Sequence, residues 1–279
     1  MLCSELKVGA ETPFRIVHIT DTHLTYADSR DDERKNVLAR ARAQYFPQAE
    51  AVLQEACRIA GEHHVVIMHT GDLIDFVSAA NLDRVRQFTD AHDCFMAAGN
   101  HEFSLYVGEA KEDAAYRNQS LDKVQAVFRN DIRMASRVIH GVNFVALDNG
   151  YYLFEKEQLD FVKAEVNKGF PIILMMHTPL FEQQLFDELM GAMGECTVEK
   201  PCAYLAGVPQ EKMKAYSPER FEQQKADEVT LEAIAYFKSE PLIKAILAGH
   251  VHRTMDAKLT EKVPQIITST TDIRLITVV

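Results

Sequence analysis

Acidic, amide and imidazole side chains follow short apolar runs at five places in this chain of 279 residues. The apolar runs have the length and composition of buried strands. In chain order, the residues that follow them are Asp21 and His23, Asp72 and Asp75, Asn100 and His101, His177, and His250 and His252. Because ligand sites in α/β sheets form where the carboxyl ends of strands open onto loops, we expect these side chains to meet in one place.

The spacing within the blocks allows two residues to bind the same ion. In an extended segment, residues i and i+2 point to the same side, so Asp21 and His23 can hold one ion together. By the same argument, His250 and His252 can reach one centre or two neighbouring ones. A mixture of carboxylate and imidazole ligands suits Zn, Fe, Mn or Co, whereas thiolate ligands are missing from every block.

Two ions at this place would give the chain a specific chemistry. Ions roughly 3.5–4 Å apart can clamp the attacking and leaving oxygens of an in-line displacement at phosphorus. They also lower the pKa of a bound water to about 7, which supplies hydroxide at neutral pH. A protonated imidazole beside the leaving oxygen typically adds about 10²–10⁴-fold to the rate. The pattern therefore predicts hydrolysis of a phosphate ester.

The five blocks, D-x-H, G-D, G-N-H, H and G-H-x-H in this order, resemble the calcineurin-like metallophosphoesterase family, including its bacterial-type Ser/Thr phosphatases and phosphodiesterases. The blocks extend from residue 21 to residue 252. One block alone is common by chance, but five in order, each after a strand, are specific. The resemblance implies an α/β fold, a four-layer α/β/β/α sandwich of two mixed β-sheets flanked by helices.

The resemblance also implies a role for each residue of the blocks. The first ion would be held by Asp21, His23, Asp72 and His252. The second ion would be held by Asp72, Asn100, His177 and His250, so that Asp72 bridges the pair. His101 would be no ligand, but would donate a proton to the leaving group or bind phosphate, with Asp75 orienting its ring. The ions would be two divalent or trivalent transition metals, namely Mn, Fe or Zn.

Two positions depart from the family's pattern. Glu102 stands where some relatives carry Asp. Phe76 stands where the eukaryotic-type protein phosphatases carry an Arg that clamps phosphate, which weakens a phosphoprotein phosphatase reading. The arginines that could replace it are Arg30, Arg34 and Arg253.

The elements between the blocks alternate between strands and helices, as in an α/β protein. Strands are expected at 14–20, 65–69, 95–98, 143–147, 172–176, 242–248, 266–270 and 273–279. Helices are expected at 34–60 with a break at Pro47, and at 80–90, 114–129, 155–167 and 229–238. The late strands lack long helical connections, so that part of the sheet should be more antiparallel.

The length fits a single domain over residues 1–279. Residues 181–228 stand out because Gly and Pro are scattered among charges without periodicity. We interpret this segment as an insertion, either a lid near the site or a surface excursion without a role.

Composition limits the partners. The net charge is −11 and no long Lys/Arg run is present, which argues against a nucleic-acid partner and against a nuclease. Residues 1–14 do not have the pattern of a signal peptide, and no window holds 18 consecutive apolar residues, so no membrane partner is expected. Five cysteines at irregular spacing form no disulfide framework and favour a cytoplasmic location. Nothing in the sequence indicates the oligomeric state.

The sequence therefore predicts a metal-dependent phosphoesterase. The first expectation is hydrolysis of a small phosphodiester by in-line attack of a hydroxide that bridges the metals. The alternative is a phosphomonoesterase, either a nucleotidase or a phosphoprotein phosphatase. A non-catalytic scaffold is less favoured, because none of the expected ligands is missing.

Overall fold

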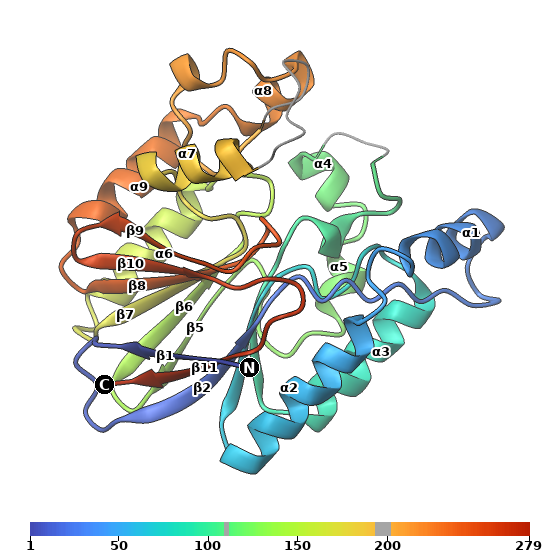
Figure 1. The fold of residues 1–279 in the computed structure, drawn as a ribbon, viewed down its shortest axis with the longest axis horizontal. Coiled ribbons are helices and arrows are strands. Elements are labelled where there is room, and N and C mark those ends of the chain that lie inside the picture. The colour runs from blue at the N-terminus through green and yellow to red at the C-terminus, as the bar shows by residue number, and fades with distance from the viewer. Residues whose placement is uncertain (109–111, 193–201) are drawn as a thin grey trace.

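The computed structural model describes residues 1–108, 112–192 and 202–279, and its strands form two mixed sheets (Figure 1). The first sheet has the order β1 (Leu2–Leu6), β11 (Arg274–Val278), β2 (Phe14–Ile19), β3 (Val66–Thr70) and β4 (Cys94–Ala97). The second has the order β5 (Met134–Ile139), β6 (Val142–Leu147), β7 (Ile172–Met176), β8 (Ile243–Ala248), β10 (Val263–Ile267) and β9 (Met255–Thr260).

The two sheets face each other, and helices cover their outer faces. Alternation along β2 shows the layering, because Ile16 packs between the sheets while Val17 packs outward against helices. The outer face of the first sheet carries α2 (Ala49–His63) and α3 (Ala79–Ala91). The outer face of the second carries α6 (Lys156–Val166) and α9 (Glu228–Ser239). The expected four-layer α/β/β/α sandwich is confirmed.

The expectation of a more antiparallel late half is only partly right. β9 is antiparallel to β10, and β11 is antiparallel to β2. However, β10 is parallel to β8. The chain runs out along the edge strand β9 and returns between β9 and β8, so a short connection still produces a parallel neighbour. The strands β1, β5 and β9 were not expected, because their residues are only partly buried and carry little apolar signal.

Two expected helices are each divided in the structure. Residues 34–60 form α1 (Glu33–Arg42) and α2, and Pro47 lies in the break between them. Residues 114–129 form the short helices α4 (Ala114–Arg117) and α5 (Leu121–Gln125). The break after Arg42 matters for function, because it places that side chain beside the site described below.

Residues 181–228 contain more regular structure than the sequence predicts. They include α7 (Gln183–Ala192), the 3₁₀ turn η2 (Gln210–Lys212) and α8 (Pro218–Gln224), while residues 193–201 lie outside the described residues. Leu185, Phe186 and Leu189 form the buried side of α7. The apolar residues of α7, which also include Met190, follow helical spacing, but over only ten residues in a segment that otherwise shows no period. Figure 1 shows α7 and α8 together at one end of the molecule, beyond the second sheet.

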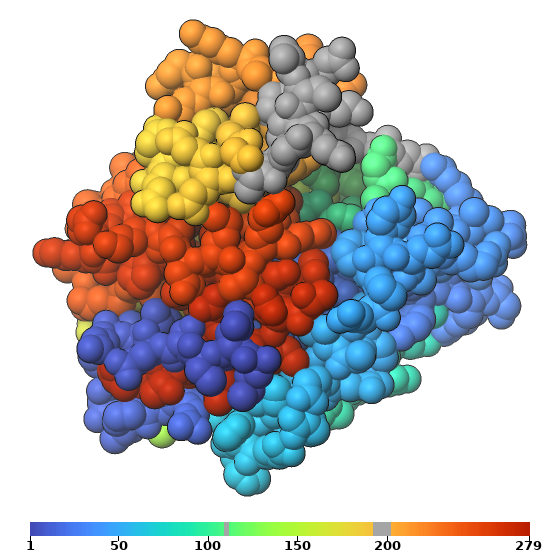
Figure 2. Space-filling view, in the orientation of Figure 1, coloured from blue at the N-terminus to red at the C-terminus, as the bar shows by residue number. Residues whose placement is uncertain are grey.

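The first and last strands of the chain lie side by side, because β1 pairs in parallel with β11. Figure 2 shows this pairing on the surface, where the blue N-terminal segment lies against the red C-terminal one. Within the described ranges, no helix has the length and apolar character needed to cross a membrane.

Candidate metal centre

The five sequence blocks lie at the carboxyl ends of five strands. Those after β2, β3 and β4 come from the first sheet, and those after β7 and β8 come from the second. The loops meet at one end of the sandwich, as the strand pattern predicts. Both sheets therefore contribute side chains to the same place.

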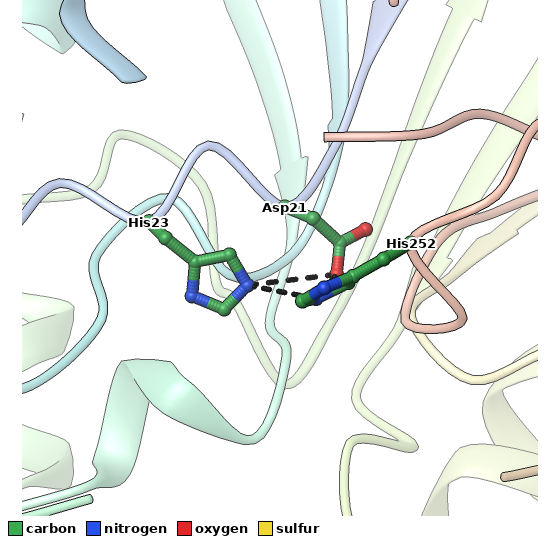
Figure 3. A group of neighbouring side chains, drawn as sticks. All are labelled: Asp21, His23 and His252. Carbon is green, nitrogen blue, oxygen red and sulfur yellow. Dashed lines mark hydrogen bonds and ion pairs between the residues drawn. The ribbon is translucent and has the colours of Figure 1, made fainter. Parts of the chain in front are cut away.

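The first ligand group consists of Asp21, His23 and His252. One potential ligand atom from each lies within 4.8 Å of the others. Figure 3 shows the three side chains pointing toward a common point. The Nε2 atoms of His23 and His252 are 3.1 Å apart, and His252 Nε2 is 3.3 Å from Asp21 Oδ1.

The second ligand group consists of Asp72, His177 and His250, again within 4.8 Å of one another. His177 Nε2 lies 3.1 Å from Asp72 Oδ2 and 3.0 Å from His250 Nδ1. Asp72 Oδ2 is also 3.6 Å from His23 Nε2 of the first group. Asp72 thus stands between the two groups, where a bridging ligand is expected.

Asn100 joins the second group through its position beside Asp72 on a shared cavity wall. Its Oδ1 atom is buried and accepts no hydrogen bond from the described residues. Its Nδ2 donates to Glu112 Oε1 at 2.7 Å. A buried carbonyl oxygen without a donor is costly unless something positive binds it. Together with the carboxylates and imidazoles, this oxygen completes a donor set that fits two transition-metal ions.

Three of the imidazoles are fixed through the nitrogen that does not face the centre. His23 Nδ1 pairs with Asp75 Oδ1 at 2.9 Å, His177 Nδ1 with the Thr70 carbonyl at 2.8 Å, and His250 Nε2 with the Tyr152 hydroxyl at 2.8 Å. Such outer contacts orient metal-binding histidines and set their tautomer. The remaining nitrogen of each ring is therefore directed toward the ligand groups.

Left-handed backbone conformations aim most of these side chains. The φ angles are 50° at Asp21, 52° at His23, 58° at Asp72, 68° at His250 and 51° at His252. Positive φ is uncommon outside glycine, although Asp and His are among the residues enriched there, and such conformations cluster at functional sites. The blocks are therefore turned rather than extended, which corrects the i, i+2 argument from the sequence while leaving its outcome unchanged.

Glycines allow the loops to approach backbone to backbone. Gly71 has φ +93°, and a Cβ atom there would lie 2.5 Å from the backbone N of Gly99. A Cβ atom at Gly249 would collide with the side chains of Thr20 and Asp21. The close approach of these loops thus depends on these small residues.

The electrostatics favour cations. Burial disfavours the ionised form of Asp72, but the imidazoles of His177 and His101 outweigh it and hold the pKa of Asp72 well below its usual range. Burial likewise disfavours charge on His177, yet the Asp72 and Asp21 carboxylates raise its pKa to about 10. Burial, and next the neighbouring His177, lower the pKa of His250. The centre therefore keeps its carboxylates ionised and attracts positive charge.

His101 lies at the edge of the centre, on the 3₁₀ turn η1 (His101–Phe103). Its Nδ1 is 2.7 Å from the Asp75 backbone carbonyl and 3.3 Å from the Asp75 carboxylate. The carboxylate itself makes shorter contacts with His23, at 2.9 Å, and with Arg42, at 2.6 Å. Burial opposes a charge on His101, but Asp72 and Asp75 raise its pKa. Asp75 therefore contacts two histidines, whereas the sequence suggested only His101.

Glu102 connects two of the blocks. Its carboxylate accepts hydrogen bonds from the backbone N–H groups of Asp72, Leu73 and Gly99, each at 2.7 Å. Burial and the charge of Asp72 raise its pKa to about 7. The residue that departs from the family pattern thus holds the turns after β3 and β4 together.

A cavity of about 390 Å³ opens beside the second ligand group. Its lining includes Ser104 and Glu112, which follow η1. Tyr204 and Arg220, from residues 181–228, also line it, as does Arg253, which follows the last block. Part of the 181–228 segment therefore lines the space in front of the centre.

Several residues at the site have no signal in the sequence. Arg42, Tyr152, Glu112 and Arg220 lie outside all five blocks and at no fixed spacing from them. Of the three arginines expected as phosphate clamps, Arg253 lines the cavity, whereas Arg30 pairs with Asp28 and Asp83 at the surface and Arg34 stacks over the Tyr106 ring.

Comparisons with known proteins identify the family and the fold. A family model described as calcineurin-like phosphoesterase matches residues 14–254. No curated protein sequence is significantly similar to the chain. Among solved structures, a dimetal phosphatase from Danio rerio has a TM-score of 0.53 and 16% identity, covering 92% of this chain and 88% of that one. This similarity supports the fold.

Two further solved structures are more distant. A putative 5'-nucleotidase from Staphylococcus aureus has a TM-score of 0.48 and 15% identity, with 94% of this chain and 50% of that one covered. The phosphopantetheinyl hydrolase of Mycobacterium tuberculosis has a TM-score of 0.47 and 10% identity, with 92% and 89% covered.

Proposed function

The chain belongs to the calcineurin-like phosphoesterase family, and from that premise we propose that it hydrolyses a small phosphodiester at a dinuclear metal centre. The observation that carries the proposal is the pair of ligand groups around Asp72, which lie next to a cavity that also contains His101. The ligand sets are those the sequence suggests. The first is Asp21, His23, Asp72 and His252, and the second is Asp72, Asn100, His177 and His250.

The protein's own residues would bind and position the substrate and move one proton. When bound, the two ions would supply a hydroxide nucleophile at neutral pH and neutralise charge on the phosphoryl oxygens. The Nδ1 atom of His101 contacts the Asp75 carbonyl, so Nε2 is the atom available to donate a proton to the leaving oxygen. Asp72 and Asp75 raise the pKa of His101 and so favour the form that can donate.

The size of the cavity supports a diester. A phosphodiester carries a substituent on each of two oxygens, and a cavity of about 390 Å³ beside the ligand groups has room for both. Its lining includes Ser104 and Glu112 from one segment and Tyr204 and Arg220 from another. We propose that residues 1–279 form a single domain and that the described part of the 181–228 insertion acts as a wall or lid over this cavity.

A phosphomonoester is the second candidate. Arg220 and Arg253 both line the cavity, and two guanidinium groups suit a phosphoryl group with two negative charges. The identity of the metals as Mn, Fe or Zn, the cytoplasmic location and the absence of a nucleic-acid partner stay predictions of the sequence.

The experiment that separates the two candidates compares bis-p-nitrophenyl phosphate with p-nitrophenyl phosphate. Both substrates release the same leaving group, so the ratio of their kcat/KM values reports the preference of the phosphoryl site. We expect the Mn²⁺-loaded protein to turn over the diester faster. Much faster turnover of the monoester would replace the first candidate with the second, and inactivity on a broad panel of phosphoesters would reject both.

A further inference from the structure

A chain of hydrogen bonds joins helix α8 to the metal centre. Arg220 Nη1 donates to Gln223 Oε1 at 2.5 Å, and Gln223 Nε2 donates to Glu112 Oε2. The other carboxylate oxygen of Glu112, Oε1, accepts from Asn100 Nδ2 at 2.7 Å. Helix α8 and the segment before α4 are distant in sequence, and Figure 1 places both at the same end of the molecule.

Each link in this chain has a defined direction. Both carboxylate oxygens of Glu112 accept hydrogen bonds, so the group of Asn100 that faces it is the NH₂. The Asn100 carbonyl oxygen then has to point the other way, and that is the buried Oδ1 atom without a donor. Gln223 is fixed in the same manner, because Arg220 can only donate to its carbonyl oxygen.

We infer that Glu112 is a positioning residue that orients the Asn100 amide for metal binding and couples α8 to the second ion. The inference rests on the proposed function, because it gives Asn100 the role of a ligand. Both oxygens of Glu112 are engaged within the protein, which argues for a structural contact with Asn100 rather than a direct contact with substrate. None of the sequence blocks contains Glu112 or Gln223.

The alternative explanation is that Glu112 attracts the cation only by its charge. Two substitutions separate these roles. Glu112→Leu removes both the acceptor and the charge, whereas Glu112→Gln removes the charge but keeps one carbonyl oxygen that can accept from Asn100. In Glu112→Gln, the new NH₂ group would face the NH₂ of Gln223, so the link to α8 is lost while the link to Asn100 remains.

The first test is a calorimetric titration of metal-free protein with Mn²⁺, with metal content checked by elemental analysis. In wild type we expect two ions. In Glu112→Leu we expect the second-group ion to bind about 10–100-fold more weakly, which is the usual cost of removing a residue that orients a metal ligand. The affinity for the first-group ion should be unchanged. In Glu112→Gln we expect most of that affinity to return. Equal losses in both variants would overturn positioning in favour of simple charge.

The second test asks whether α8 acts through Glu112. Gln223→Leu should weaken the second ion less than Glu112→Leu, and adding it to Glu112→Leu should cause no further loss, because the path is already broken. The matched control is Glu222→Leu, since Glu222 is an exposed acid on the same helix. Additive effects of Gln223→Leu and Glu112→Leu, or a loss in the control equal to that in Gln223→Leu, would overturn the coupling.

The outcomes also separate this inference from the proposed function. If wild type binds two ions and Glu112→Leu binds them with the same affinity, the positioning role is wrong and the dinuclear centre stands. If wild type binds fewer than two ions under the same conditions, both are wrong. Thermal unfolding of each metal-free variant shows whether a loss comes from misfolding, and Glu112→Gln provides the test if Glu112→Leu does not fold.

Discussion

The two ligand groups of the centre differ in how firmly the protein holds them. The His252 side chain of the first group is 42% exposed, whereas the His177 side chain of the second is fully buried. His177, His250 and Asn100 each have an outer partner that fixes their orientation. In the first group, the clearest support is for His23, which pairs with Asp75 and stacks on another ring.

This difference indicates that the two ions would bind unequally. A preorganised group loses less freedom when it binds an ion, and its outer partners are part of its affinity. We therefore expect the second-group ion to bind more tightly and to exchange more slowly. The first-group ion, next to exposed His252, is expected to be the exchangeable one.

The largest effect should come from Asp72→Asn. It should weaken the binding of both ions, because Asp72 stands between the two ligand groups. Asn tolerates a positive φ, so the turn should survive. If each ion binds about 10–100-fold more weakly, the losses multiply to about 10²–10⁴-fold in activity at limiting metal. Elemental analysis together with kcat/KM measures this effect. Full occupancy of both sites would show that Asp72 does not bridge them.

His101→Ala should separate catalysis from both ligand groups. We expect two ions to remain bound, while hydrolysis of substrates with poor leaving groups slows by about 10²–10⁴-fold. Substrates with good leaving groups, such as p-nitrophenyl esters, should be affected much less. A set of leaving groups of increasing pKa measures the slope, and an unchanged slope would contradict the role of His101 as an acid.

Arg42→Gln should affect the first group alone. Arg42 contacts the Asp75 carboxylate at 2.6 Å, and that carboxylate holds His23. Without the guanidinium, we expect the first-group ion to bind about 10–100-fold more weakly and the second-group ion to stay as in wild type. Competition with a chelator of known affinity measures both constants. Weaker binding of the second-group ion instead would show that Arg42 and Asp75 support the second ligand group rather than the first.

The pH dependence should be clearest in the second group. The pKa of His177 is raised to about 10, so this imidazole is protonated at pH 7, and its proton must leave before Nε2 can bind an ion. Below that pKa, apparent affinity should therefore rise about tenfold for each unit of pH. Titrations at pH 7 in two buffers of different ionisation enthalpy count the protons released. Binding of the second ion without proton release would contradict this expectation.

Tyr152→Phe should give the smallest effect and serves as the counterpart of Arg42→Gln. It removes the hydroxyl that contacts His250 Nε2 and leaves the ring in place. Loss of one neutral hydrogen bond costs about 1 kcal/mol, or roughly fivefold in the affinity of the second-group ion. The same chelator competition measures it. A larger change at the first group than at the second would show that the two groups are not independent.

The sequence indicated most of the side chains that the structure brings together, because they come at the ends of strands that an apolar run identifies. Asp21 and His23 after β2, and His250 and His252 after β8, are examples in which strand pattern and residue type coincide. Apart from Asp75, the sequence did not predict the outer partners. Arg42 comes from the end of a helix and Glu112 from a loop, and only the packing of distant segments brings them to the site.

The fold was predictable in its layers but less so in its pairings. Strongly apolar strands such as β2 and β7 are evident from composition, whereas β1 and β9 are stabilised by partners that composition does not reveal. Helix α7 was missed because its helical spacing covers only ten residues in a segment otherwise without periodicity. In each case tertiary contacts, rather than local preference, decide the structure.

The position of the ligand groups between the two sheets has a consequence for how the chain folds. Asp21 and Asp72 come from loops of the first sheet, and His177 and His252 come from loops of the second. Neither sheet alone therefore contains a full set of donors for either ion. The complete sites for the ions therefore form only after the two sheets have packed together, late in folding. Bound metals should then slow unfolding while leaving the refolding rate almost unchanged.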